Sequence, residues 1–171
     1  NGTAHAVKSA DVDSITGDVL ILNGDHPMIG AEDIKYFIKT FRETKADLAV
    51  VTCEFDDPGS YGRIVRHKGD VRAIVEAKDA SAETLEIKEI NTGLYVVKAE
   101  VLIENLNKIQ SYNKQNEFYL TDIVALTHEN GGRVVGIKSG VHVASGVNSQ
   151  IELSRASKDI FKKKITSLME Q

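Results

Sequence analysis

Residues 18–27 read DVLILNGDHP, and this segment gives the first indication of the fold class. Its first six residues are almost continuously apolar, which is typical of a strand buried on both faces of a parallel sheet. Gly24, Asp25 and Pro27 then end the run. Open α/β sheets bind ligands just beyond the carboxyl ends of their strands, so Asp25 is the first candidate functional residue. A turn aspartate that bonds its own backbone is the alternative interpretation.

The next segments continue a pattern of strand, helix and strand. Between residues 31 and 45, four apolar side chains recur at helical spacing, namely Ile34, Phe37, Ile38 and Phe41. Residues 47–53 (DLAVVTC) are again apolar and β-branched, as in a buried strand. Units of this kind, crossing over with a right hand, build doubly wound sheets. The sequence therefore predicts an α/β fold.

The remaining elements extend this α/β domain. Residues 63–67 and 71–77 flank Lys68-Gly69-Asp70, which predicts a β-hairpin that leaves the parallel core. Further strands are expected at 89–97 and 133–138, and further helices at 100–109, at 121–130 and from Asn148 to the end. Asn148 is a favourable N-cap for this last helix.

Composition disfavours several classes of protein. The chain has 171 residues, 42% of them hydrophobic and 27% charged, which fits one globular domain. A formal net charge of -4 gives no overall attraction to a phosphate backbone, so no nucleic-acid partner is expected. No apolar run approaches the roughly 18 residues of a membrane span, and no membrane partner is expected. The single cysteine, Cys53, allows no internal disulfide, which fits a cytoplasmic location.

Two glycine-containing segments stand where a ligand could approach the backbone. Gly2 and Thr3 precede a helical stretch, so backbone amides and a hydroxyl could meet a nucleotide base or a phosphate. An ordinary helix start is the alternative. Gly62 follows a turn-rich segment and lacks a side chain, so its backbone could lie close to a ligand. A simple loop that enters the hairpin explains the same residues.

Polar residues on the predicted strands form further candidates. Glu76 and Lys78 would share one strand face, because strand side chains alternate, and could hold a sugar hydroxyl and its phosphate. A surface ion pair is the alternative. Asn91 and Thr92 interrupt an apolar strand, where a buried amide needs partners such as a ligand hydroxyl. Asn148 could cap its helix or coordinate a metal, but one side-chain oxygen cannot fully serve both roles.

Several familiar catalytic motifs do not occur in the sequence. It contains no glycine-lysine phosphate loop, no His-Glu-x-x-His, no Gly-x-Ser-x-Gly and no Gly-x-Gly-x-x-Gly. The five histidines are scattered without zinc-ligand spacing. A zinc hydrolase, a serine esterase and a standard dinucleotide oxidoreductase are therefore disfavoured.

Seven short motifs, taken in order along the whole chain, resemble one family. They are GTAHA (2–6), LNGDHP (22–27), YGRI (61–64), IVEAKDA (74–80), EINTG (89–93), EFYLTD (117–122) and GVN (146–148). The family is the bacterial N-acetylglucosamine-1-phosphate uridyltransferases, the pyrophosphorylase half of the bifunctional GlmU proteins. Each motif alone is weak, and their shared order makes the resemblance specific. The sequence departs from the family at Asn23, where tyrosine is common, and at Ala4, where glycine is common.

This resemblance implies a Rossmann-like nucleotidyltransferase with a mixed sheet, flanking helices and a hairpin excursion. It also implies that UTP and N-acetylglucosamine 1-phosphate give UDP-N-acetylglucosamine and pyrophosphate, with Mg²⁺ as cofactor. By motif position, Asp25 and Asn148 would be the catalytic, metal-binding residues. Substrate would be bound by Gly2 and Thr3 at the uracil, by Gly62, Glu76, Asn91 and Thr92 at the amino sugar, by Lys78 and Tyr119 near the sugar phosphate, and by Asn23 and Gly24.

Elementary chemistry agrees with this implied activity. Mg²⁺ typically takes only one or two protein groups and leaves its other positions to water and phosphate oxygens, so one carboxylate and one amide suffice. The attacking sugar phosphate is already an anion, so no general base is required. In-line displacement at the α-phosphorus then expels pyrophosphate. This explains why no nucleophile and base pair is found among the motifs.

The resemblance covers only the later part of the family's catalytic domain. The family's opening strand and its glycine-rich loop have no counterpart here, so a first βαβ portion is expected to be missing and this chain alone to be inactive. Residues 1–150 are expected to form the later nucleotidyltransferase domain and 151–171 a helical arm. The arm would lead toward a left-handed β-helix domain that makes the full-length protein a homotrimer. A sister nucleotidyltransferase for another sugar or base, and a non-catalytic nucleotide-sugar binding module, are the alternatives.

Overall fold

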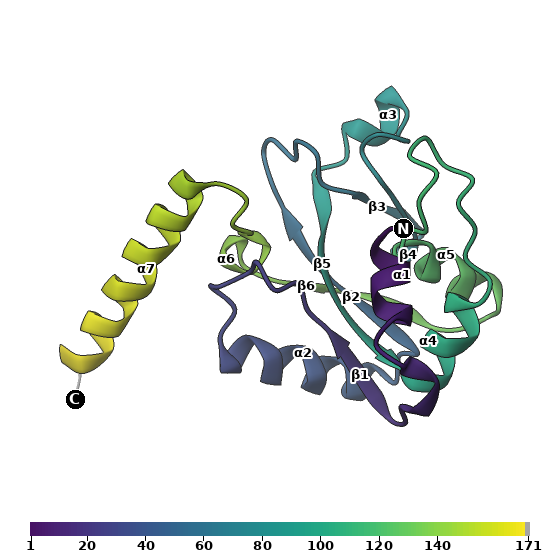
Figure 1. The fold of residues 1–171 in the computed structure, drawn as a ribbon, viewed down its shortest axis with the longest axis horizontal. Helices are drawn as coiled ribbons and strands as arrows, with labels where there is room; N and C mark the ends of the chain where they lie inside the picture. The colour runs from purple at the N-terminus through teal and green to yellow at the C-terminus, as the bar shows by residue number, and fades with distance from the viewer. Residues whose placement is uncertain (170–171) are drawn as a thin grey trace.

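The structure, a computed structural model, describes residues 1–169 and is built on one six-stranded mixed sheet (Figure 1). Five strands lie in the order β4-β3-β5-β2-β6, and β1 pairs with β5 beside this path. The strands are β1 (Asp18–Ile21), β2 (Leu48–Glu54), β3 (Arg63–His67), β4 (Asp70–Val75), β5 (Glu89–Lys98) and β6 (Val134–Lys138). The predicted α/β class with a mixed sheet is confirmed.

Strand β5 is the centre of the sheet. Both β1 and β2 pair with it antiparallel, with Val19 and Leu48 on either side of Val97, while β6 pairs parallel with β2. The prediction for β1 was therefore wrong in two respects, since this strand is antiparallel to its neighbour and only half buried. Side chains on both of its faces do pack against apolar clusters, which explains the continuous apolar run. Such a run does not specify the direction of the neighbouring strand.

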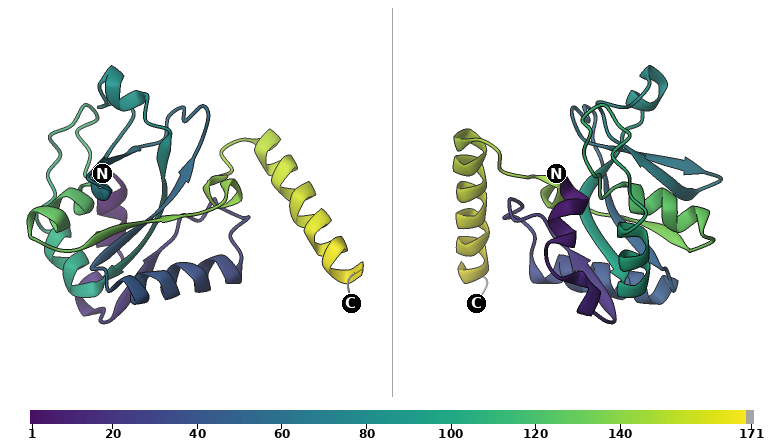
Figure 2. Two further views of the ribbon diagram at one scale, coloured as in Figure 1. Left: turned by 180° about the vertical axis from the view of Figure 1, so that it is seen from behind. Right: turned by 45° about the vertical axis from the view of Figure 1, so that its right-hand side comes forward.

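Helices cover both faces of the sheet (Figures 1 and 2). On one face α2 (Ala31–Thr44) buries Phe37 and Phe41 against β2, β5 and β6, together with α6 (Val141–Ala144). On the other face lie α1 (Thr3–Lys8), η1 (Val12–Ser14), α4 (Ala99–Leu106) and α5 (Asp122–Glu129). A single helical turn, α3 (Ala82–Leu85), lies between β4 and β5. The helices predicted at 31–45, 100–109 and 121–130 are thus confirmed within a residue or a few at each end.

The predicted hairpin is also confirmed as β3 and β4. Lys68 and Gly69 both adopt positive φ, 51° and 93°, as a tight two-residue hairpin turn requires. Strand β4 stops at Val75, earlier than predicted. The backbone amides of Asp79 and Ala80 both donate to the Glu76 carbonyl, which bends the chain into a turn. Residues 76–80 are therefore not a strand.

The last helix, α7 (Gln150–Met169), projects away from the sheet (Figures 1 and 2). Ala156 is the buried apolar residue that it contributes, whereas Phe161 is 69% exposed. Along residues 1–169, none of the helices combines the length and the apolar character that crossing a membrane requires.

Candidate active site

A cavity of about 430 Å³ opens beyond the carboxyl ends of β1 and β4. It collects many of the residues that the motifs singled out, from both ends of the chain. The predicted site residues that line it are Thr3, Asn23, Asp25, Gly62, Glu76, Asn91, Thr92 and Asn148. Residues more than a hundred positions apart therefore share one hollow, as the prediction required.

One corner of the cavity joins Asp25 to Asn148. The backbone amide of Val147 donates to the Asp25 carbonyl at 2.9 Å, so the loop that carries Asn148 is tied to the end of β1. Gly146 allows this approach, because a Cβ there would lie 3.3 Å from an Asp25 carboxylate oxygen and 3.1 Å from the His26 ring. His26 in turn hydrogen-bonds the Val143 carbonyl through Nδ1 at 3.0 Å. We call Asp25 and Asn148 the metal corner, after the ion that the sequence predicts them to bind.

Asn148 does not cap α7, contrary to the prediction. The Ser149 hydroxyl accepts the Glu152 backbone amide at 3.2 Å, and the Glu152 carboxylate accepts the Asn148 backbone amide at 2.8 Å. Together these contacts form a capping arrangement shifted by one residue. The backbone amides of Asn148 and Ser149 lower the pKa of Glu152. The Asn148 carboxamide is thereby left free, and it has no hydrogen-bond partner within residues 1–169.

The donor atoms of the metal corner are of the kind that hard cations prefer. Across residues 1–169 no group of three or more His, Cys, Asp or Glu side chains is arranged to hold a metal. The corner instead presents one carboxylate and one amide oxygen. Neither has a hydrogen-bond partner in the described chain, although His26 Nε2 lies 3.7 Å from Asp25 Oδ1. This hard oxygen set fits Mg²⁺, which fills its remaining positions with water and phosphate oxygens. It does not fit a structural zinc site.

Another part of the cavity wall is a bulge in β5 (Asn91, Thr92, Gly93 and Tyr95), which we call the sugar floor after the ligand that the sequence predicts there. Its register against β2 shifts between Val50 and Thr52, and Gly93 has a φ of 81°. The Asn91 carboxamide accepts from Gly93 N at 3.0 Å and donates to the Tyr95 hydroxyl at 2.9 Å. The buried Thr92 hydroxyl donates to the Val51 carbonyl at 2.8 Å. The floor is therefore largely satisfied from within the protein.

Glu76 and Gly62 stand beside this floor. The Asn91 backbone amide donates to the Gly62 carbonyl, and a Cβ on Gly62 would lie 3.4 Å from a Glu76 carboxylate oxygen. The other Glu76 oxygen accepts from the Thr121 hydroxyl at 3.2 Å. Burial raises the pKa of Glu76, and the nearby Asp79 adds to the effect. Glycine at position 62 thus leaves the carboxylate open to the cavity.

Four predicted residues are not among those that line the cavity: Gly2, Gly24, Lys78 and Tyr119. Lys78 was predicted to share a strand face with Glu76, which is wrong because β4 ends before Glu76. Lys78 instead donates to Gln115, which in turn donates to the Tyr119 hydroxyl at 2.7 Å. These side chains form a polar flank outside the cavity.

Gly2 and Thr3 pack against the backbone of residues 118–120, of which Leu120 lines the cavity. Gly2 has a φ of 119°, and a Cβ there would meet the Phe118 backbone. The Thr3 hydroxyl accepts from the Leu120 amide at 2.9 Å, and Ala4 N donates to the Phe118 carbonyl at 3.0 Å. This pairing explains the glycine at position 2, and it fixes Thr3 at the rim.

Sequence reasoning missed two residues on the sugar side. Thr121 holds Glu76, and Tyr95 holds Asn91. Tyr95 could have been found from strand alternation, because it follows Asn91 and Gly93 at steps of two along β5. Thr121 lay within a quoted motif, but nothing in the local pattern connected it with Glu76, 45 positions earlier.

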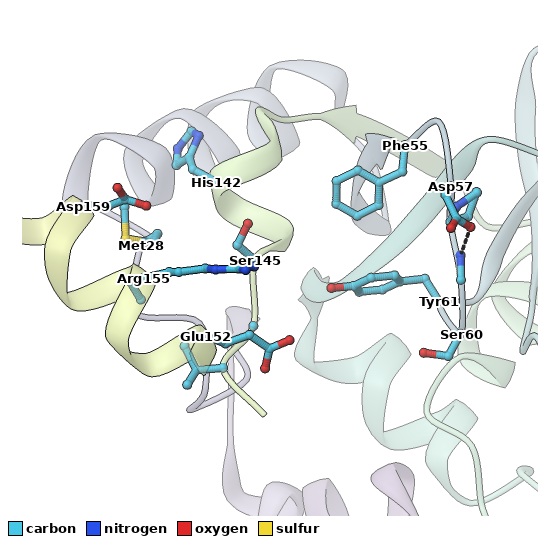
Figure 3. A pocket seen from close by; sticks show the side chains of 15 residues that line it. Met28, Phe55, Asp57, Ser60, Tyr61, His142, Ser145, Glu152, Arg155 and Asp159 are labelled. Atoms are coloured by element: carbon cyan, nitrogen blue, oxygen red, sulfur yellow. Dashed lines mark hydrogen bonds between the residues drawn. The ribbon is translucent and has the colours of Figure 1, made fainter. Parts of the chain in front are cut away.

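A second cavity of about 550 Å³ adjoins the first on the side of α7 (Figure 3). Figure 3 shows Arg155 and Asp159 of α7 on one side of it, with Phe55 and Tyr61 on the other. The two cavities share Ser60, Tyr61, Gly146 and Glu152. The Tyr61 hydroxyl donates to the Ala144 carbonyl at 2.8 Å, which links its loop to α6. The two cavities thus have part of their walls in common.

Residues 1–140 match the family model described as nucleotidyl transferase. The chain belongs to the nucleotidyl transferase family. A crystal structure of a Bacillus anthracis protein assigned as a glucose-1-phosphate thymidylyltransferase shares the fold, with a TM-score of 0.66 at 19% identity over 91% of this chain and 59% of that one.

Two curated relatives of this nucleotidyl transferase are much more similar in sequence. The bifunctional protein GlmU of Bdellovibrio bacteriovorus is 57% identical over 169 residues, and that of Thermosipho melanesiensis is 44% identical over 171 residues. Each alignment covers 99% of this chain and 37% of the relative. The resemblance to GlmU proteins is therefore confirmed, and the chain spans little more than a third of their length.

Proposed function

We propose that this chain belongs to an enzyme that transfers the uridylyl group of UTP to N-acetylglucosamine 1-phosphate and releases pyrophosphate. One observation carries the proposal: Asp25 and Asn148 face the same cavity as Glu76 and Asn91. A metal-binding corner and a sugar-binding floor thus adjoin, as phosphoryl transfer between a nucleotide and a sugar phosphate requires. The likeness to GlmU proteins supports this choice of base and sugar.

In this proposal the metal corner holds the nucleotide. Asp25 and Asn148 would bind Mg²⁺ through a carboxylate and an amide oxygen. When bound, Mg²⁺ neutralises phosphate charge and orients the α-phosphorus for in-line attack. The Val147 to Asp25 hydrogen bond keeps the two ligands together before substrate arrives, which reduces the cost of ordering them.

The sugar floor would position the attacking group. The Glu76 carboxylate would accept a hydrogen bond from a sugar hydroxyl. The second N–H of Asn91, which has no acceptor in the described chain, would donate a hydrogen bond to the sugar. Hydrogen bonds from the rest of the floor hold Asn91 in a fixed orientation, so the sugar phosphate arrives close to the attack geometry. No general base is needed, since the attacking oxygen is already anionic.

The charge of the cavity supports a need for added cations. Among the described residues that line it, Asp25, Glu76 and Glu152 are acidic, and there is no lysine or arginine. A triphosphate placed here would meet uncompensated negative charge. We therefore propose that the reaction depends on Mg²⁺, and that the 171-residue chain by itself binds UTP weakly and does not turn it over.

The division of the chain forms part of the same proposal. Residues 1–150 would be the later part of the nucleotidyltransferase domain, and 151–171 an arm that leads out of it. The family match ends at residue 140, and α7 is mostly exposed, which supports this boundary. A trimeric whole protein in the cytoplasm remains the prediction that follows from the resemblance.

A pyrophosphate-release assay tests the function. The protein that carries this sequence is given UTP with N-acetylglucosamine 1-phosphate, with and without Mg²⁺. Parallel reactions replace the sugar phosphate by glucose 1-phosphate, and UTP by GTP or dTTP. We expect release with the first pair alone and only when Mg²⁺ is present. Preference for another sugar or base would favour a sister nucleotidyltransferase, and absence of release from every pair would refute the enzyme.

A further inference from the structure

Tyr95 contributes a buried phenol to the sugar floor. Its ring packs among the apolar side chains of the core and only 2% of the residue is exposed, yet it lines the cavity. A buried phenol needs hydrogen-bond partners, because leaving its hydroxyl unpaired costs free energy.

The neighbouring Asn91 determines how the Tyr95 hydroxyl is used. The Gly93 backbone N–H can only donate, so the Asn91 atom that faces it at 3.0 Å is the carbonyl oxygen. The Asn91 NH₂ group therefore faces Tyr95, 2.9 Å away, and it too can only donate. Tyr95 must accept this hydrogen bond, so its own proton points elsewhere.

That proton has no acceptor among residues 1–169. The nearby Glu76 carboxylate is hydrogen-bonded to Thr121 rather than to Tyr95. Burial first, and then the negative charge of Glu76, raise the pKa of Tyr95, so the phenol keeps its proton at physiological pH. The cavity floor thus holds an unused O–H donor next to the unused second N–H of Asn91.

Two donors side by side suit a group that only accepts. A sugar hydroxyl can donate or accept and places no such demand on its site, whereas the carbonyl oxygen of an acetamide has two lone pairs and no proton. The acceptor Glu76 beside them completes a pattern that an N-acetyl sugar matches and a plain hexose matches less well. A site with buried donors rejects an analogue that leaves them unpaired.

We propose that the Tyr95 hydroxyl is a specificity-determining substrate contact, which donates to the acetamide carbonyl oxygen of an N-acetylhexosamine held over Asn91. This inference rests on the proposed function, since it assumes that the sugar moiety of a nucleotide sugar occupies this cavity. Tyr95 then has two roles, because the same oxygen also orients the Asn91 amide.

The test compares Tyr95→Phe with the unaltered protein in titrations with UDP-N-acetylglucosamine, UDP-glucose and UDP. Loss of one hydrogen bond of ordinary strength should weaken UDP-N-acetylglucosamine binding about tenfold. UDP should bind within about twofold of the unaltered protein. UDP-glucose should lose clearly less affinity than UDP-N-acetylglucosamine, because only the loss of the Asn91 contact affects it. Tyr112→Phe, which removes a hydroxyl from a residue that is 92% exposed, serves as the matched control.

Equal weakening for both sugars, unchanged affinity for UDP-N-acetylglucosamine, or loss of UDP binding itself would each overturn the assignment. Pyrophosphate release is measured separately. If the unaltered protein releases none but Tyr95→Phe still loses the acetamido sugar selectively, the proposed function fails and the Tyr95 contact stands. If pyrophosphate is released but Tyr95→Phe shows no selective loss of UDP-N-acetylglucosamine, the proposed function stands and the Tyr95 contact fails. If the unaltered protein binds neither UDP-sugar and releases no pyrophosphate, both proposals fail.

Discussion

The metal corner and the sugar floor of the cavity are built on opposite principles. In the corner, the Asp25 carboxylate and the Asn148 carboxamide have no hydrogen-bond partner in the described chain, although neighbouring backbone atoms hold their segments together. On the floor, Asn91 and Thr92 are bonded to the protein itself. The corner thus leaves its side-chain oxygens free for a ligand, while the floor uses most of its polar groups to maintain a shape and leaves only the Tyr95 O–H and one Asn91 N–H for a ligand.

Within one cavity, the hydrogen bonding of a polar group indicates whether it binds a ligand or supports the fold. Polar groups left unpaired by the protein must find water, an ion or a substrate, so changes there should alter activity more than stability. Groups paired within the protein hold the backbone, so changes there should alter stability first. The same residue type can therefore have different consequences on the two sides of the cavity.

The most severe test removes the charge from the corner. Asp25→Asn keeps the shape but weakens the hold on Mg²⁺, and loss of several kcal/mol of electrostatic stabilisation should lower kcat about a thousandfold. The affinity for UDP-N-acetylglucosamine, measured by titration without metal, should change only severalfold. A loss of rate and product affinity by equal factors would break the distinction between corner and floor.

Two adjacent residues give a matched comparison at the start of α7. Asn148→Ala should lower turnover about a hundredfold, the range found when one preorganised polar group is removed, with little change in Tm. Ser149→Ala should instead cost about 1 kcal/mol of helix stability through loss of the cap. Amide hydrogen exchange at Glu152 would report that loss. Faster exchange in Asn148→Ala than in Ser149→Ala would restore Asn148 as the cap.

On the floor, Thr92→Val should affect stability more than chemistry. The hydroxyl bonds the Val51 carbonyl across the bulge, and its removal leaves a buried carbonyl unpaired at a cost of about 1 to 2 kcal/mol. Urea unfolding measures this loss, with the exposed Thr166→Val on α7 as control. Turnover per folded molecule should fall far less than in Asp25→Asn. A stable but inactive Thr92→Val protein would place Thr92 among the substrate contacts.

The sequence predicted those parts of the fold and site that depend on local pattern. Lys68 and Gly69 mark the hairpin, because both turn positions need positive φ, and Phe37 and Phe41 mark one helix face. The motif order brought Asp25 and Asn148 together correctly, although no local physics connects them. Resemblance, rather than periodicity, carried that part of the prediction.

The wrong predictions concern where an element begins or ends and which strand it pairs with. Strand alternation put Lys78 beside Glu76, but the argument holds only if the strand continues, and the turn at Glu76 ends it. Asn148 and Ser149 are both good caps, and the choice between them depends on where the helix begins. The antiparallel pairing of β1 depends on β5, which lies more than seventy positions later. Such choices are made by tertiary contacts that a single sequence does not display.

The smallest expected effect is a pH dependence of stability that arises on the sugar side of the cavity. Burial, with help from Glu76 and Asp79, raises the pKa of Asp122 from 3.8 to about 6 on the sugar side of the molecule. The folded protein therefore keeps this proton over a range in which the unfolded chain has lost it. Stability should consequently fall as pH rises from about 4 to 6, and stay lower above it.

Asp122→Asn cannot lose a proton, so it should escape this penalty. Because Asp122 is only partly buried, solvent screening reduces the effect, and we expect about 1 kcal/mol. Urea unfolding at pH 4 and pH 7 checks it, with the stability difference between variant and unaltered protein as the readout. That difference should favour Asp122→Asn more at pH 7 than at pH 4. If the stability difference between Asp122→Asn and the unaltered protein is the same at both pH values, the charged Asp122 carboxylate is fully solvated. Burial would then not raise the pKa of Asp122 in the folded protein.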